Sequence, residues 1–212
     1  MTMRVKICGV KAPEDALMAS KLGAWAIGFN FYPKSPRHIE PTAARAVIAR
    51  LPASVAKVGL FVNTKIEHIQ KVMMMCKLDL IQLSGNESLD YCKELGGRRI
   101  IKAFRPDKFE DLPDPEDLFF LGAVLIDAPK GSDGLYGGTG RLACREFCKP
   151  LQDAGVRVIL AGGITPENVR AICDEVHPWA IDVASGVESA PGVKDPAKMK
   201  ALFAALDTYA GN

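Results

Sequence analysis

Short apolar runs alternate with longer segments of helical pattern along the whole chain. The first run, residues 4–9, reads as a strand that ends in Cys8-Gly9, and a helical pattern follows it directly from Ala12. Similar runs recur to the C-terminal region. They predict further strands at residues 25–30, 55–62, 78–83, 99–104, 121–127, 156–161 and 179–183.

The segments between these runs have the spacing of amphipathic helices, with one exception. Between residues 105 and 117 the prolines at 106, 113 and 115 prevent a long helix, so we expect a loop with one turn there. After the first helix, the pattern predicts helices at about residues 42–51, 65–76, 87–95 and 142–153, from Pro166 onward, and at residues 196–206.

Strands that are almost continuously Val, Ile and Leu, each followed by a helix, indicate a parallel sheet. Eight such units in 212 residues predict an α/β fold of the (βα)8 TIM-barrel type with a degenerate fifth helix. A doubly wound open sheet is the alternative, but it usually carries its phosphate loop after the first strand. No linker-like composition divides the chain, so we expect one domain over residues 1–212.

Composition and charge exclude several classes of protein. The chain is 48% hydrophobic and 25% charged, and its net charge of +2 comes from 27 basic and 25 acidic residues that are interspersed. This argues against a nucleic-acid or membrane surface. Since there is no signal-peptide pattern or membrane-spanning run, we expect a soluble, cytoplasmic protein.

Six cysteines are present without a CxxC pair, and we interpret all except Cys8 as small buried apolar residues in the reduced state. Cys144 and Cys148 lie one helical turn apart, but no nearby histidine completes a zinc site. The histidines at positions 38, 68 and 177 do not fall at predicted strand ends. We therefore expect neither a metal nor a cofactor.

Strand periodicity divides the residues of each strand between the barrel interior and the helix-facing side. It directs Lys6, Cys8, Asp127 and Asp182 inward, the last three at or near the carboxyl ends of strands. Buried charges are costly unless they are paired or functional. One interpretation is a structural network of Lys6 and Lys102 with the two aspartates; the other, which the strand-end placement favours, is an acid and a base across a small cavity.

Glycine-rich loops follow the last three predicted strands, where barrels commonly bind phosphate. Glycines lack a side chain that would block an anion from backbone N–H groups, so together the loops predict a phosphorylated ligand. The glycine loops contain Gly137-Gly138-Thr139-Gly140, Gly162-Gly163 and Ser185-Gly186.

An ordered series of motifs between Lys6 and Asp195 resembles the phosphoribosylanthranilate isomerase family of tryptophan biosynthesis. The series comprises Lys6-Ile7-Cys8-Gly9 with Glu14-Asp15-Ala16, Gly28 to Phe31 with Ser35-Pro36-Arg37, Gly59 to Asn63, Gln82-Leu83, Gly137 to Gly140, Leu160 to Gly163 with Pro166 to Val169, and Asp182 to Glu188 with Pro191-Gly192 and Lys194-Asp195.

The resemblance implies an Amadori rearrangement of phosphoribosylanthranilate to an aminoketose phosphate, with Cys8 as general base and Asp127 as general acid. It also implies that Arg37 holds the anthranilate carboxylate and that Asp182 orients the substrate. The chemistry asks for positive charge near the thiolate, which Lys6 and the imine intermediate can supply. It asks for a water-poor pocket that keeps Asp127 protonated.

Two positions depart from the family pattern. Ser84 stands where the family usually has histidine, and Leu142-Ala143-Cys144 stands where an aromatic pair is usual. The alternatives are a metal-dependent ribulose-phosphate epimerase, which needs strand-end histidines, and a non-catalytic barrel that binds a phosphorylated metabolite. We expect a small-molecule substrate, no nucleic-acid or membrane partner, and a monomer or homodimer.

Overall fold

A closed barrel of eight parallel strands forms the centre of the computed structural model, which describes residues 2–127, 140–207 and 209. Each strand pairs with its neighbours in the sequence, and β8 pairs with β1 to close the barrel. The (βα)8 architecture is therefore confirmed. The barrel strands are β1 (Val5–Cys8), β2 (Ala26–Asn30), β3 (Ala56–Phe61), β4 (Leu80–Leu83), β5 (Ile100–Phe104), β6 (Ala123–Asp127), β7 (Val158–Ala161) and β8 (Ala180–Val183).

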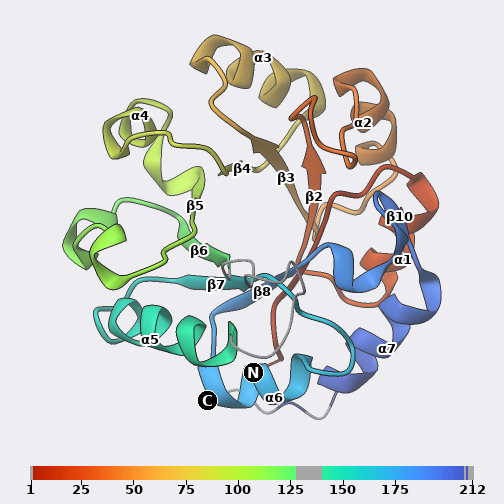
Figure 1. The fold of residues 1–212 in the computed structure, drawn as a ribbon. Helices are drawn as coiled ribbons and strands as arrows, with labels where there is room; N and C mark the ends of the chain where they lie inside the picture. Colours follow the sequence, from red (N-terminus) through yellow and green to blue (C-terminus); the bar gives the residue numbers. More distant parts are fainter. Residues whose placement is uncertain (1, 128–139, 208, 210–212) are drawn as a thin grey trace.

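Helices surround the barrel and cover the outer faces of its strands (Figure 1). Proline stands near the start of three of them, α1, α2 and α7, where its missing N–H is not needed. The α-helices of the described residues are α1 (Pro13–Lys21), α2 (Pro41–Ile48), α3 (Ile66–Cys76), α4 (Leu89–Glu94), α5 (Gly140–Asp153), α6 (Val169–Val176) and α7 (Pro196–Leu206).

The connection between β5 and β6 contains two 3-10 turns, η2 (Phe109–Asp111) and η3 (Pro115–Leu118), in place of an α-helix. All of its residues are described, so the predicted degenerate fifth helix is confirmed, with two turns where one was expected. Pro115 opens the second turn. The physical cause is that proline lacks an N–H and clashes with the preceding helical turn.

Strand residues separate into two hydrophobic layers, as the period of two predicts. Val5 and Ile7 of β1 lie in the large layer between strands and helices, whereas Lys6 of β1 lies inside the barrel and is completely buried. The inner layer is built mainly from small or β-branched residues, which fit the narrow interior. It contains Ala26, Val58, Ile101, Ala103, Ala123, Leu125, Ile159, Ala161 and Ala180.

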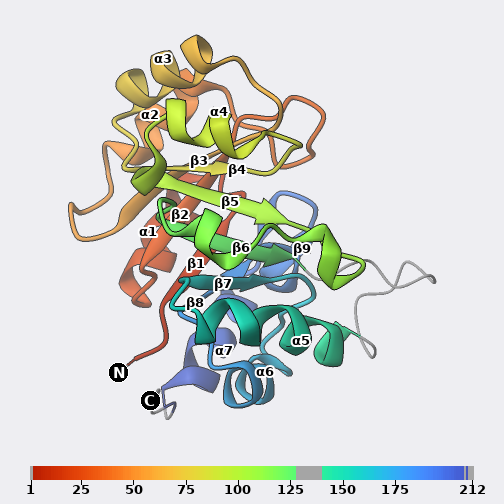
Figure 2. The ribbon, with the colours of Figure 1, turned by 90° about the vertical axis from the view of Figure 1, so that its left-hand side faces the viewer.

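A two-stranded hairpin, β9 (Glu188–Ala190) and β10 (Val193–Lys194), lies between β8 and α7 and was not predicted. Its turn contains Gly192, which has a φ of +81° that a non-glycine residue would adopt only with strain. Figure 2 shows the barrel from the side, with β9 near the end toward which the strand arrows point. The hairpin therefore belongs to the carboxyl-terminal mouth of the barrel.

Candidate active site

A cavity of about 600 Å³ opens at the carboxyl ends of the strands. Its lining brings together eight of the predicted site residues, from five different strands or the loops after them. Of the remaining predictions, Gly138 and Thr139 lie outside the described residues, and Gly140 begins α5. The predicted residues that line the cavity are Cys8, Arg37, Asp127, Gly162, Gly163, Asp182, Ser185 and Gly186.

Cys8 ends β1 with its side chain directed inward, and the residue is 5% exposed. Beside it, the Lys6 ammonium donates a hydrogen bond to the Asp182 carboxylate, with 2.8 Å between Nζ and Oδ1. Gly28, the register partner of Cys8 on β2, makes room for both groups. A Cβ at Gly28 would lie 2.9 Å from Cys8 Sγ and 3.1 Å from Lys6 Nζ.

The surroundings of Cys8 favour the thiol in the protein alone. Burial raises the pKa of the Cys8 thiol and the Asp182 carboxylate raises it further, while Lys6 and Lys194 oppose this without reversing it. Although burial lowers the pKa of Lys6, the nearby Asp182 and Cys8 raise it more, so the ammonium keeps its charge. Lys6 therefore supplies positive charge beside Cys8, as expected, but in the protein alone it does not bring the pKa of the thiol below its ordinary value.

Asp127 ends β6 and lines the same cavity as Cys8. Its Oδ2 accepts a hydrogen bond from Arg105 Nε at 3.0 Å, and its side chain is 28% exposed. Arg105 also donates to the Ser84 carbonyl, so it bridges the ends of β4 and β6. The Arg105 guanidinium and partial exposure to solvent make the environment of Asp127 polar. From the sequence, a water-poor pocket was expected there.

Lys102 belongs to a second buried ion pair, which was predicted with the wrong partner. Its Nζ lies 2.8 Å from Glu87 Oε2 and 2.6 Å from the Gly85 carbonyl oxygen, whereas the network interpretation placed it against the aspartates. Glu87 in turn accepts from the backbone N–H groups of Asn63 and Gly85. The pair therefore fastens the loops after β3 and β4.

Arg37 lines the cavity from the loop after β2, and its guanidinium is held by Glu188 at the start of β9. Arg37 donates to both carboxylate oxygens of Glu188, from Nε at 2.9 Å and from Nη2 at 2.7 Å. The buried Lys194 ammonium also donates to Glu188, at 2.9 Å. Burial tends to raise the pKa of Glu188, but the hydrogen bonds from these two cations lower it overall.

Glycine is sterically required in the loops after β7 and β8. Gly162 and Gly163 have φ values of +86° and +64°, and a Cβ at Gly186 would lie 1.8 Å from the Ile164 carbonyl oxygen. The Asn168 side chain holds the first of these loops, accepting from Thr165 N and donating to Gly163 O, both at 2.8 Å. Both loops line the cavity, beside Cys8 and Asp182.

Gln82 and Ser84 lie on the cavity wall at the end of β4. Gln82 Nε2 lies 3.2 Å from Ser84 Oγ, and Gln82 Oε1 is a buried acceptor without a hydrogen-bond partner among the described residues. Because an unsatisfied buried acceptor is costly, a hydroxyl donor on a ligand would be favourable there. Ser84 thus occupies a position that faces the cavity, where the family usually has histidine.

Sequence reasoning missed Arg105 as a residue of the mouth, and it saw Gln82, Glu188 and Lys194 only as parts of motifs. Glu188 carried one usable signal, since it is the last residue of the motif that begins at the strand end with Asp182. Nothing in the sequence joins Glu188 to Arg37, 151 positions away. Their pairing depends on closure of the barrel.

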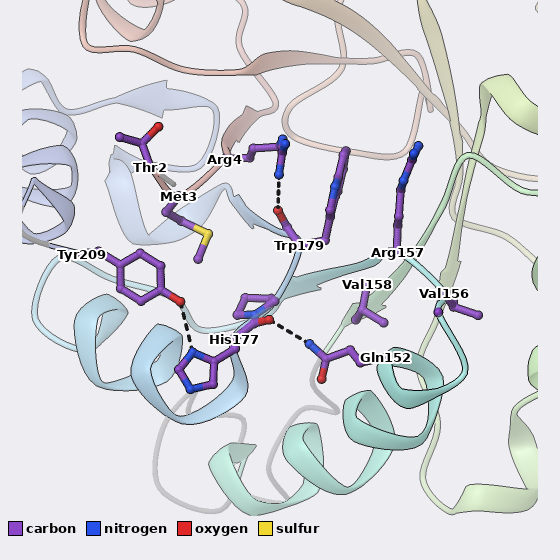
Figure 3. A pocket seen from close by; sticks show the side chains of 12 residues that line it. Thr2, Met3, Arg4, Gln152, Val156, Arg157, Val158, His177, Trp179 and Tyr209 are labelled. Atoms are coloured by element: carbon purple, nitrogen blue, oxygen red, sulfur yellow. Dashed lines mark hydrogen bonds between the residues drawn. The ribbon is translucent and has the colours of Figure 1, made fainter. Parts of the chain in front are cut away.

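A separate cavity of about 370 Å³ lies at the amino-terminal end of the barrel (Figure 3). There the Trp179 ring lies between two guanidinium groups, with 4.8 Å from Arg4 and 5.6 Å from Arg157 to the ring centroid. The indole also packs edge-on against Trp25. In TIM barrels the amino-terminal end serves stability and the carboxyl end serves chemistry, so we interpret these contacts as closing the bottom of the barrel.

Across the described residues, no three side chains of the His, Cys, Asp and Glu types gather as metal ligands would. His68 lies within α3, and His177 follows the end of α6. The same part of the chain contains no helix with both the length and the apolar composition needed to cross a bilayer.

Fold and mouth together define an enzyme of the (βα)8-barrel class. The family model described as N-(5'-phosphoribosyl)anthranilate (PRA) isomerase matches residues 5–205. An N-(5'-phosphoribosyl)anthranilate isomerase of Syntrophus aciditrophicus is 44% identical over 207 residues, covering 98% of this chain and 88% of the relative. The chain belongs to the phosphoribosylanthranilate isomerase family, and it is an isomerase of tryptophan biosynthesis.

Two solved structures show the same fold. A phosphoribosyl anthranilate isomerase in complex with reduced 1-(o-carboxyphenylamino)-1-deoxyribulose 5-phosphate is 36% identical, with a TM-score of 0.83, covering 98% of this chain and 100% of that one. Monomers derived from a dimeric isomerase of Thermotoga maritima are 35% identical, with the same TM-score and the same coverage.

Proposed function

We propose that the chain converts N-(5'-phosphoribosyl)anthranilate to 1-(o-carboxyphenylamino)-1-deoxyribulose 5-phosphate at the carboxyl-terminal mouth of the barrel. The observation that carries the proposal is that a thiol and a carboxyl group, Cys8 and Asp127, line one cavity together with the loops at Gly162-Gly163 and Ser185-Gly186. A relative's complex with the reduced product supports a ligand of this size and charge.

The first step is ring opening. Asp127 donates a proton to the furanose ring oxygen, the bond between that oxygen and carbon one breaks, and the nitrogen lone pair forms a protonated imine at carbon one. In the protein alone this carboxyl group accepts a hydrogen bond from Arg105 Nε at 3.0 Å. A positioned acid of this kind typically contributes 10²–10⁴-fold to the rate.

The second step is removal of the proton on carbon two by Cys8. The electron pair of that C–H bond moves to the imine, giving an enolamine that tautomerises to the aminoketose, so the whole reaction is an isomerisation. Because burial raises the pKa of Cys8, the protein alone holds this group mainly as the thiol. The imine cation formed in the first step adds positive charge in the cavity and favours the thiolate when it is needed.

The remaining groups bind the substrate. The loops after β7 and β8, with the predicted Gly138, Thr139 and Gly140, would hold the phosphate through backbone N–H groups. Arg37 would bind the anthranilate carboxylate, as arginine often does. Asp182 would hold the sugar from the end of β8, where the Lys6 ammonium fixes its position.

All of these groups come from one chain, so the site itself is compatible with a monomer or a homodimer. The single-domain organisation over residues 1–212 and the cytoplasmic location stay predictions. So does the absence of a cofactor.

The deciding experiment is a fluorescence assay that follows the purified protein with phosphoribosylanthranilate and separates product formation from spontaneous release of anthranilate. We expect protein-dependent formation of the aminoketose phosphate. Binding of the substrate without turnover would instead support a non-catalytic metabolite-binding barrel. Turnover of ribulose 5-phosphate in place of phosphoribosylanthranilate would support the epimerase alternative.

A further inference from the structure

The guanidinium that faces the cavity is already bound to a carboxylate of the protein. Glu188 takes two N–H groups of Arg37 in a fork-to-fork pair and accepts from Lys194 as well. The Glu188 side chain is 4% exposed, that of Lys194 is 0% exposed and that of Arg37 is 24% exposed. Glu188 and Lys194 are therefore buried behind Arg37, which is the member of the cluster that faces the cavity.

The charges of this cluster suit an anionic ligand. Two cations and one carboxylate leave one net positive charge, and burial of Glu188 and Lys194 keeps that charge weakly screened. Without Glu188 the two cations would repel each other, and Arg37 would lose the two hydrogen bonds that orient the plane of its guanidinium.

The rest of Arg37 is fixed by its surroundings. Its backbone N–H donates to Ser35 Oγ at 3.1 Å, and a Cβ at Gly9 would lie 2.6 Å from Arg37 Cδ. Only a glycine at position 9 leaves room for the arginine stem across the end of β1. The turn of the hairpin also meets the loop after β2, because a Cβ at Gly192 would lie 2.8 Å from the Pro36 carbonyl oxygen.

We propose that Glu188, supported by Lys194, is a positioning and specificity residue that holds Arg37 ready for the aromatic carboxylate of the substrate. The proposal rests on the function proposed above. Its physical basis is preorganisation: an arginine held in its binding geometry pays less side-chain entropy when the ligand arrives. A ligand that carries only the ribose phosphate does not use this contact.

The test is calorimetric binding of two probes to the purified protein. One probe is reduced 1-(o-carboxyphenylamino)-1-deoxyribulose 5-phosphate, which carries the carboxylate, and the other is ribose 5-phosphate, which does not. For Glu188→Gln we expect an affinity at least tenfold lower for the first probe and less than twofold lower for the second. Arg37→Ala is the reference, because it removes the contact outright and should show the same selectivity with a larger loss.

Two further variants separate positioning from charge and from folding. Glu188→Asp keeps the charge that the two cations need, but its side chain is one methylene shorter and cannot hold Arg37 in the same plane. We expect it to lose at least fivefold affinity for the carboxylate probe. Ser189→Ala alters the next residue of β9, whose exposed hydroxyl is 3.4 Å from the Val193 carbonyl oxygen, and should bind both probes as the wild type does.

Several results would overturn the proposal. Wild-type affinity in Glu188→Asp would show that Glu188 only neutralises the two cations. Equal losses of affinity for both probes would show that its role is structural. Tighter binding of the carboxylate probe in Glu188→Gln would show that Glu188 competes with the substrate for Arg37. A wild-type protein without preference between the probes would remove the proposed function itself, and with it this role. That failure is recognisable because it shows before any variant is made.

Discussion

Lys6 and Asp182 form an ion pair inside the barrel, between register partners on β1 and β8, with 2.8 Å between Nζ and Oδ1. It lies where the closing strand of the barrel meets the first one, and Cys8 is the next inward residue of β1. One pair therefore both fastens the closure of the barrel and sets the electric field at the thiol.

Replacing Cys8 tests the base directly. Cys8→Ala should lower turnover by about 10²–10⁴-fold, because no other group at the end of β1 can take the proton. The measurement is kcat for phosphoribosylanthranilate, with the melting temperature to show that the fold is kept. Cys173→Ala is the matched control, since that thiol is buried between helices and strands. Turnover near the wild-type rate in Cys8→Ala would remove Cys8 from the mechanism.

Lys6 should shift the pH dependence of the reaction. Burial and Asp182 raise the pKa of Cys8, whereas Lys6 and Lys194 lower it. The specificity constant kcat/KM should therefore rise with pH as the thiol ionises. Lys6→Met removes one of the cations that lower the pKa of Cys8. The rising part of the plot of kcat/KM against pH should therefore move to higher pH. A profile between about pH 6 and pH 10 would show this.

Removing Lys6 alone also leaves the Asp182 carboxylate buried and unpaired, which costs about 3–5 kcal/mol. The double variant Lys6→Met/Asp182→Asn avoids this cost, but it also removes the carboxylate that raises the pKa of Cys8, so it tests the ion pair as a unit and not Lys6 alone. Lys102→Met breaks a different buried ion pair, with Glu87, and should leave the rising part of the pH profile where it is in the wild type. If the pH dependence of kcat/KM in Lys6→Met matched that of the wild type, Lys6 would have no influence on the ionisation of Cys8.

Asp127→Asn should abolish ring opening, because the amide cannot donate the proton, while affinity for ribose 5-phosphate stays within about twofold. We expect turnover to fall at least about 100-fold. Arg105→Met serves as comparison, because it breaks the same contact of 3.0 Å but keeps the acid, and it should lose less activity. If Asp127→Asn turned over like the wild type, another group would be the acid.

Gly28→Ala tests how tightly the thiol is positioned. The added methyl carbon would lie 2.9 Å from Cys8 Sγ and 3.1 Å from Lys6 Nζ, so one of the two must move. We expect kcat to fall at least about tenfold with little change in KM, because misplacement of a reacting group by a fraction of an ångström acts on the chemical step. Gly122→Ala is the control, as it crowds the Arg98 carbonyl oxygen at the opposite end of β6.

Glu188 should contribute to stability against acid. Its folded-state pKa lies below the ordinary value of 4.5, so its contribution is present above that pH and is lost as the pH falls through the folded-state pKa. The melting temperature of the wild type should therefore fall more steeply than that of Glu188→Gln between about pH 6 and pH 3. Parallel curves would show that the carboxyl group titrates alike in the folded and unfolded chains.

Local patterns in the chain predicted the barrel and the direction of its key side chains. The period of two directs Cys8, Asp127 and Asp182 inward without knowledge of any partner, and the prolines between residues 105 and 117 removed the fifth helix. The sequence also predicted which end of the barrel holds the active site, because parallel strands place all of their carboxyl ends together.

The partners of the charged residues were decided only in three dimensions. Lys6 pairs with Asp182 because the last strand closes on the first, and Lys102 reaches Glu87 rather than an aspartate because of how the loop after β4 folds back. Arg37 meets Glu188 because a hairpin after β8 comes to lie against the loop after β2. Side-chain direction is a property of each strand and can be predicted locally, whereas ion pairing depends on distances that exist only once the barrel has closed.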